Sequence, residues 1–188
     1  MILKQSPLHG MTAGKLATVA IWELPGLATI DLRVAPGTDA YVAVSAALKL
    51  ELPGKQGEAA QKIISEGESV YALRLSPDGW LIVGYENALE KLSPLKNQHH
   101  FSAVDVSGQR TIIELEGPKV RELLAHLWEQ DLREKNFPVG SVSQGLMAKA
   151  PVIVCHIAPL SYRLMVRSSF AVHLWKALVD AGKEYYQS

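Results

Sequence analysis

The segment FSAVDVSGQRTIIELEGP, residues 101–118, places two β-rich runs on either side of Ser107 and Gly108. A serine hydroxyl can bind nearby backbone groups and a glycine tolerates positive φ, so this pair predicts a chain reversal. We therefore expect the segment to form a hairpin in which Asp105 and Arg110 face each other across two strands. Such an exposed pair would contribute roughly a few tenths of a kcal/mol to stability. The alternative is a buried Asp105 that contacts a ligand or a partner.

Similar patterns lie on both sides of this segment. SVYALRLSPDGWLIVGY (69–85) predicts a second hairpin around Ser76, Pro77, Asp78 and Gly79, because each of these residues favours a turn. Helical spacing of apolar residues and capping signals predict four helices. The first two are expected at 39–50, after the cap residue Thr38, and at 86–92. The third follows Pro118 and carries Leu123 and Leu124, and the fourth covers 169–186 with Trp175 on its buried side. Three further strands are expected at 141–149, 151–158 and 161–168, and a polar connection at 55–68.

The order of these elements predicts an α+β fold made of two similar lobes with mostly antiparallel sheets and packed helices. The lobes are expected at about 21–98 and 99–188, after a flexible N-terminal segment at 1–20. A chain of 188 residues can bury roughly 70% of its unfolded surface, which is enough for a stable core.

Composition argues against several classes of partner. The 19 Lys and Arg residues balance the 19 Asp and Glu residues, so no basic excess favours nucleic acid, and no charge block or apolar span favours a membrane. Cys155 is the single cysteine, which rules out an internal disulfide and is typical of a reducing, cytoplasmic environment. It lies in an apolar run, where cysteine usually acts as a small core residue.

Searches for catalytic motifs give no assignment. The chain has neither a Gly-x-x-x-x-Gly-Lys-Ser/Thr loop nor a Gly-x-Gly-x-x-Gly turn, and its six scattered His residues form no metal-binding pair. Glu114 and Glu116 alternate on one strand and are expected on a solvated sheet face. We therefore predict no catalytic, cofactor-binding or metal-binding residue in this chain.

Five segments span roughly residues 30–186, namely 32–53, 73–84, 101–124, 137–154 and 162–185. Their most characteristic stretches are Ser76-Pro77-Asp78-Gly79-Trp80-Leu81, Asp105-Val106-Ser107 and Arg167-Ser168-Ser169-Phe170-Ala171. Taken together, and in this order, the segments resemble the gamma subunit family of heterotetrameric sarcosine oxidase. Gly145 departs from the pattern, since a hydroxyl or larger side chain is expected there, and a strand glycine indicates a bulge or a close backbone approach.

The resemblance implies a fold like the folate-binding region of aminomethyltransferase, the T-protein of glycine cleavage. It also implies a complex that oxidises sarcosine with oxygen to glycine, a one-carbon unit and hydrogen peroxide. In such a complex FAD, FMN, NAD, folate and zinc are carried by other subunits. This chain would then be a non-catalytic subunit that stabilises the assembly by docking on the large alpha subunit.

Two functional hypotheses follow. In the first, an exposed patch binds the other subunits, with Trp80, Asp105 and Arg110 as candidate interface residues. In the second, the chain is a standalone tetrahydrofolate-binding protein of the aminomethyltransferase type, for which four residues could supply charged groups, namely Asp105, Arg110, Arg163 and Arg167. Titration with tetrahydrofolate separates these two hypotheses.

Overall fold

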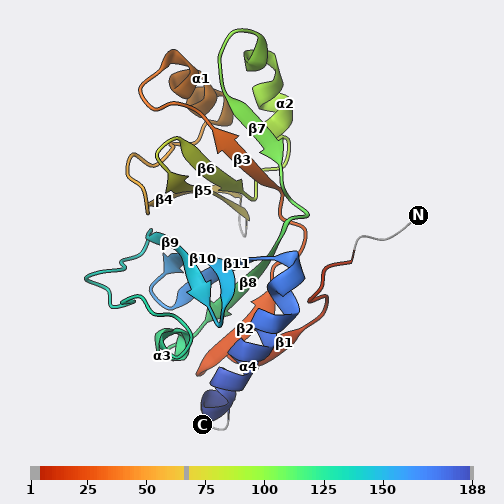
Figure 1. Ribbon diagram of the computed structural model, residues 1–188, viewed down its shortest axis with the longest axis vertical. Coiled ribbons are helices and arrows are strands. Elements are labelled where there is room, and N and C mark those ends of the chain that lie inside the picture. Colours follow the sequence, from red (N-terminus) through yellow and green to blue (C-terminus); the bar gives the residue numbers. More distant parts are fainter. Residues whose placement is uncertain (1–4, 66–67, 187–188) are drawn as a thin grey trace. The chain divides into compact units, whose positions relative to one another are not determined.

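The computed structural model describes residues 5–65 and 68–186 (Figure 1). The chain forms two compact units, one made of Met1–Pro25 together with Gly108–Ser188 and the other of Gly26–Ser107. These bounds differ from the predicted lobes at 21–98 and 99–188, because the N-terminal strands join the C-terminal half. The predicted α+β class with antiparallel sheets is confirmed, since each of the two sheets has only antiparallel pairs among the described strands.

The unit Gly26–Ser107 is built on a five-stranded sheet with the order β4-β5-β6-β3-β7. Its strands are β3 (Thr29–Arg33), β4 (Ala59–Ser65), β5 (Glu68–Ser76), β6 (Gly79–Val83) and β7 (Ser102–Asp105). The predicted hairpin at 69–85 is confirmed as the β5–β6 pair. Residues 55–68, predicted as a connection, contain the edge strand β4, and none of its residues 59–63 is buried, so the sequence pattern did not mark it.

One face of this sheet is covered by α1 (Asp39–Leu48), α2 (Ala88–Leu92) and the 3-10 helix η1 (Ser93–Asn97). The predicted cap of α1 is confirmed, because the Thr38 hydroxyl accepts a hydrogen bond from the Tyr41 amide. The helix ends at Leu48, two residues before the predicted end, and its C-cap residue Lys49 adopts a left-handed conformation with φ 49°. Val44 and Leu48 of α1 pack on Leu32 and Ile82 of the sheet, and all four are at most 1% exposed.

The other unit has a six-stranded sheet with the order β1-β2-β8-β11-β10-β9. Its strands are β1 (Thr12–Lys15), β2 (Val19–Glu23), β8 (Arg110–Glu116), β9 (Val142–Met147), β10 (Ala150–Ala158) and β11 (Ser161–Arg167). The three strands predicted in 141–168 are confirmed. The segment 1–20 was predicted to be flexible, but residues 12–15 form an edge strand and Leu8 is fully buried; residues 1–4 lie outside the described residues.

A single core lies under one face of this second sheet. The helix α4 (Ala171–Tyr186) follows the 3-10 helix η2 (Ser168–Phe170) and contributes Leu174, Trp175 and Leu178 to the core. Figure 1 shows α4 running along β1 and β2. The shorter helix α3 (Val120–Ala125) contributes Leu123 and Leu124, as its apolar stripe predicts.

The hairpin predicted for residues 101–118 is wrong. β7 pairs with β3, whereas β8 pairs with β2 and β11, so the two runs belong to different sheets. Gly108 does not adopt the positive φ that a tight two-residue hairpin requires. The chain therefore passes from one unit to the other at Ser107–Gly108, and Asp105 and Arg110 are not a cross-strand pair.

In the described part of the chain, no helix is both long enough and apolar enough to cross a bilayer.

Candidate functional site

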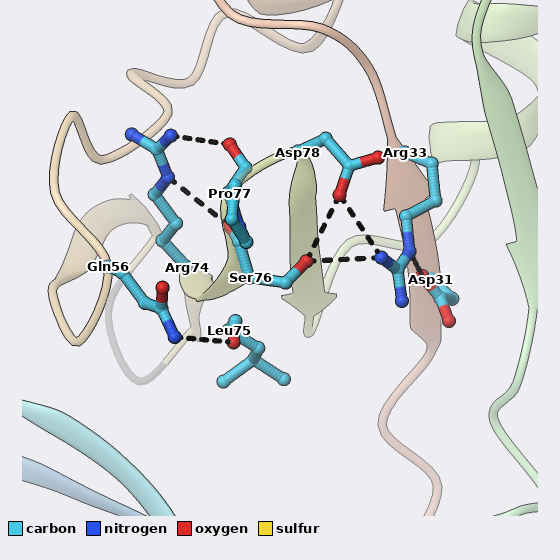
Figure 2. A network of polar contacts seen from close by, with 8 residues as sticks. All are labelled: Asp31, Arg33, Gln56, Arg74, Leu75, Ser76, Pro77 and Asp78. Carbon is cyan, nitrogen blue, oxygen red and sulfur yellow. Dashed lines mark hydrogen bonds and ion pairs between the residues drawn. The ribbon is translucent and has the colours of Figure 1, made fainter.

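The β5–β6 turn is held by a network of charged and polar side chains (Figure 2). From β3, the Arg33 guanidinium donates to the Ser76 hydroxyl at 3.1 Å and to the Asp78 carboxylate at 3.3 Å. It also donates to Asp31 at 3.2 Å. About half of each charged side chain is exposed, so these ion pairs contribute at most about 1 kcal/mol each and mainly fix the shape of the turn.

Arg74 lies on the other side of the same turn and binds backbone carbonyls. Its guanidinium donates to Pro77 O at 2.5 Å and to Gly54 O, and its Cζ lies 5.0 Å from the centre of the Trp80 ring (Figure 2 shows the contact with Pro77). This arginine thus joins the loop after α1 to the β5–β6 turn. This role is structural, because the guanidinium donates its hydrogen bonds to backbone carbonyls.

Trp80 was predicted as an interface residue, and the structure corrects this. The side chain is only 1% exposed, it packs against Tyr41 with ring centroids 5.7 Å apart, and its indole N–H donates to Pro53 O at 3.2 Å. The physical reason is that Gly79 begins β6, so the next side chain points to the helix-covered face of the sheet. Trp80 is therefore a core residue of its unit.

Asp105 stabilises the end of β7. Its Oδ1 accepts hydrogen bonds from the Ser107 amide at 2.9 Å and from the Ser107 hydroxyl at 2.6 Å. The Ser107 hydroxyl in turn accepts from the Thr29 amide at 2.9 Å, which extends the contact between this segment and β3. Asp105 is exposed rather than buried, so its described contacts are those of a turn, and its role at an interface stays a prediction.

The three candidate arginines of the second hypothesis lie on β8 and β11. Arg110 and Arg167 are directly opposite each other in the strand register, and Arg163 lies further along β11. Arg163 is buried and donates two hydrogen bonds to Glu114, the shorter one at 2.6 Å. The prediction that Glu114 is solvated is thus wrong, because its carboxylate is largely buried and paired with Arg163. Glu116 is exposed as predicted.

Cys155 is a core residue, as predicted from its apolar surroundings. It is 1% exposed, and burial raises the pKa of its thiol to about 12. A thiol with so high a pKa carries almost no thiolate near neutral pH and is a poor nucleophile.

The neighbouring His156 is also fully buried and was not singled out by its sequence context. Its Nδ1 donates to Phe137 O at 2.9 Å, and its ring stacks on Tyr162 at a centroid distance of 4.3 Å. Its Nε2 has no hydrogen-bond partner among the described residues. Because neither of these contacts involves a carboxylate, the arrangement lacks the group that orients a catalytic histidine in a triad.

An aromatic ring approaches Gly145 closely, which leaves no room for the larger side chain that the family pattern leads one to expect there. A Cβ at this position would lie 2.8 Å from Cη2 of Trp128. The β9–β10 register is regular at Gly145, so the predicted bulge does not occur there. The close approach is made by the side chain of Trp128 and not, as predicted, by backbone.

Within residues 5–65 and 68–186, no group of three His, Cys, Asp or Glu side chains could hold a metal ion. Sequence analysis missed the structural role of Arg74 and the pairing of Glu114 with Arg163. The contact of Arg74 with Gly54 and the Glu114–Arg163 pair join segments that are distant in the sequence, so no local spacing could have indicated them.

Comparison with known proteins identifies the family of this chain. Residues 34–184 match the model of the sarcosine oxidase, gamma subunit family. The chain belongs to this family. Among the relatives, the sarcosine oxidase subunit gamma of Corynebacterium sp. strain U-96 is 31% identical, with 97% of this chain and 92% of the relative covered. The gamma subunit of Corynebacterium sp. strain P-1 is 29% identical, with 97% of this chain and 88% of that relative covered.

Solved structures agree with membership of the sarcosine oxidase gamma subunit family. A chain of heterotetrameric sarcosine oxidase from Corynebacterium sp. U-96, in complex with pyrrole 2-carboxylate, has a TM-score of 0.84 and 27% identity, covering 94% of this chain and 90% of that one. Glycine cleavage system aminomethyltransferase T from Bartonella henselae has a TM-score of 0.65 at 15% identity, covering 90% of this chain and 47% of that one. The second likeness concerns the fold alone and confirms the aminomethyltransferase-like architecture expected from the sequence.

Proposed function

We propose that this chain is the gamma subunit of a sarcosine oxidase-like flavoenzyme complex and that it stabilises the assembly without catalytic residues of its own. The observation that carries the proposal is the family match over residues 34–184, joined to a gamma subunit relative that aligns over 97% of this chain. The relative of known structure is part of a heterotetrameric sarcosine oxidase.

The chemistry of the individual side chains supports an assembly role. Candidate reactive groups are engaged in structural contacts: Cys155 is buried with a raised pKa, Arg163 is paired with Glu114, and Asp105 binds Ser107. In contrast, several large apolar side chains are exposed, among them Leu146 at 62% and Phe170 at 39%. Exposed apolar side chains become favourable contacts when a partner covers them.

In this proposal the complex oxidises sarcosine with oxygen to glycine, a one-carbon unit and hydrogen peroxide. FAD, FMN, NAD, folate and zinc are held by the other subunits, and the large alpha subunit is the main docking partner. The complex acts in the cytoplasm, in keeping with a single, buried and unreactive cysteine.

Co-expression tests this proposal. The chain is produced together with the other subunits of a heterotetrameric sarcosine oxidase, and the lysate is fractionated by affinity and size. We expect the chain to co-elute with a yellow fraction that oxidises sarcosine. Elution of the chain by itself, away from every flavin-containing fraction, would overturn the proposal.

Calorimetric titration with tetrahydrofolate addresses the alternative of a standalone folate-binding protein. The assembly role predicts no saturable heat with the isolated chain. Saturable heat in the micromolar range, which corresponds to about 8 kcal/mol of binding free energy, would favour the alternative.

A further inference from the structure

A pocket of about 310 Å³ lies beside β4, at the edge of the five-stranded sheet. Its floor is apolar and includes Leu48 and Val70, both fully buried. The ring of Tyr85 forms part of the wall, and its hydroxyl donates to Leu48 O at 2.9 Å. The pocket therefore combines an apolar floor with a fixed aromatic wall, which is typical of binding sites.

Three lysines converge on the rim of this pocket from different elements. Lys49 follows α1, Lys62 is on β4 and Lys91 is on α2. The Lys62 ammonium donates to Lys49 O at 2.6 Å, and the Lys91 ammonium donates to the Tyr85 hydroxyl at 2.7 Å while lying 4.7 Å from the centre of that ring. These contacts hold two ammonium groups at the rim, and each group has further N–H donors for a ligand.

The positive charge of the rim is not balanced locally. None of the three lysines forms an ion pair with a described residue, and no Asp or Glu is among the residues that line the pocket. The surrounding unit is not basic, since Gly26–Ser107 carries seven Lys and Arg against ten Asp and Glu. Three of those seven basic residues gather at one pocket, which makes the pocket complementary to an acidic partner.

A large apolar side chain and an open strand edge complete the surface. Ile63 lines the pocket and is 72% exposed. β4 pairs with β5 along one side only, so the backbone groups of its other side are available to a further strand. Lysines on edge strands often serve only to prevent such pairing. That explanation accounts for Lys62 but not for Lys49 and Lys91, which come from helix ends.

We propose that this surface, which we call the lysine pocket, binds an acidic, extended segment of a partner polypeptide. The segment pairs with the outer edge of β4, inserts a large apolar side chain against Ile63 and Tyr85, and places carboxylates against Lys49, Lys62 and Lys91. The inference rests on the proposed function, in that the partner is another subunit of the oxidase complex.

The test compares two charge-reversed variants of the full chain, each co-expressed with the oxidase subunits. The first carries Lys49→Glu, Lys62→Glu and Lys91→Glu. The matched control carries Lys96→Glu, Lys135→Glu and Lys176→Glu, which change the net charge equally at exposed lysines that do not line the pocket. We expect the wild type and the control to co-elute with the complex and the pocket variant to be depleted at least about tenfold, the change that loss of roughly 1.4 kcal/mol produces.

Each other outcome is decisive. Co-elution of the pocket variant within about twofold of wild type would overturn the inference, and this is also the result if the pocket takes only small anions. Equal depletion of both variants would show a general charge effect and would overturn it too. If the wild type itself fails to co-elute, the proposed function fails, and this inference falls with it.

A second measurement does not depend on the folding of a variant. Hydrogen exchange of the wild-type chain is compared in the isolated and the assembled state. The inference predicts slower exchange of amides in Ala59–Ser65 upon assembly, because a paired edge is protected. Unchanged exchange in β4 would contradict strand addition even if the lysine variants lost binding.

Discussion

At the scale of single residues, charged side chains in this protein mainly bind their own chain. Arg33 and Arg74 brace one turn, Asp105 binds the following serine, and Arg163 and Glu114 pair with each other. The charged types in these positions could be read from the sequence, but their partners could not, because four of these five residues bind groups from distant segments. Sequence reasoning therefore named Asp105, Glu114 and Arg163 without their partners, and the interface role expected for Asp105 and Arg110 stays a prediction.

Asp105 gives a direct prediction at this scale. Asp105→Asn keeps an oxygen that can accept from Ser107, whereas Asp105→Ala removes it. We expect Asp105→Ala to lower the free energy of unfolding by about 1 kcal/mol and Asp105→Asn to lower it less, measured by urea denaturation. The oxidase activity of the complex should change less than about threefold for Asp105→Asn; a loss beyond about a hundredfold would contradict the structural role of this turn, since it would require about 2.7 kcal/mol of transition-state stabilisation.

Cys155 predicts a dependence of stability on pH. The folded state raises the pKa of the thiol from 9.0 to about 12, so above pH 9 the unfolded state loses this proton while the folded state keeps it. The unfolded state then binds fewer protons, and the contribution of Cys155 to stability falls as pH rises from about 9 towards 12. Wild type should lose more stability than Cys155→Ala between pH 8 and about pH 10 in urea denaturation. Parallel losses in the two proteins would contradict the raised pKa.

At the scale of elements, the helices and strands that local sequence patterns define were predicted, whereas pairings between distant segments were not. The strands β5, β6, β9, β10 and β11 and the helices α1 and α4 were expected from local patterns, since alternation and helical spacing report which side chains are buried. The sequence did not predict that β7 and β8 belong to different sheets, because Ser107–Gly108 suits a hairpin as well as a passage between sheets. β4 was missed because residues 59–63 of this edge strand are exposed or half-buried and show no alternation of buried and exposed side chains.

β9 offers a prediction about packing between an element and a side chain. Gly145→Ala places a methyl group 2.8 Å from the Trp128 ring, which is 4% exposed and has little room to move. We expect a loss of about 1–3 kcal/mol in the free energy of unfolding. Gly108→Ala is the matched control, because no atom lies within 4 Å of the added carbon and the backbone there is not left-handed. A loss at Gly145 no greater than at Gly108 would contradict the close packing.

α3 gives a second prediction about the core. Leu124 is fully buried, so Leu124→Ala leaves a cavity and should cost about 2–5 kcal/mol of unfolding free energy in a chemical denaturation experiment. Leu160→Ala removes the same atoms from a side chain that is 52% exposed and should cost much less. Similar costs for the two variants would show that α3 does not pack as described.

At the scale of the whole molecule, family membership and the fold agree, and both were anticipated by the likeness of ordered segments rather than by any one motif. The alignment of the family covers residues 34–184, which include parts of both compact units. The proposed partner surface could not be predicted from the sequence, because the lysine pocket brings together residues 49, 62 and 91, whose spacing matches no motif.

We propose that this polypeptide contributes surface and stability, while its companions carry the coenzymes and the chemistry. The most direct measurement is sarcosine-dependent hydrogen peroxide production by the isolated chain after gel filtration, with mass spectrometry of any retained small molecule. The account predicts no peroxide and no retained coenzyme. Peroxide formed by the lone chain, or a flavin, nicotinamide or folate coenzyme that stays bound to it, would contradict the account.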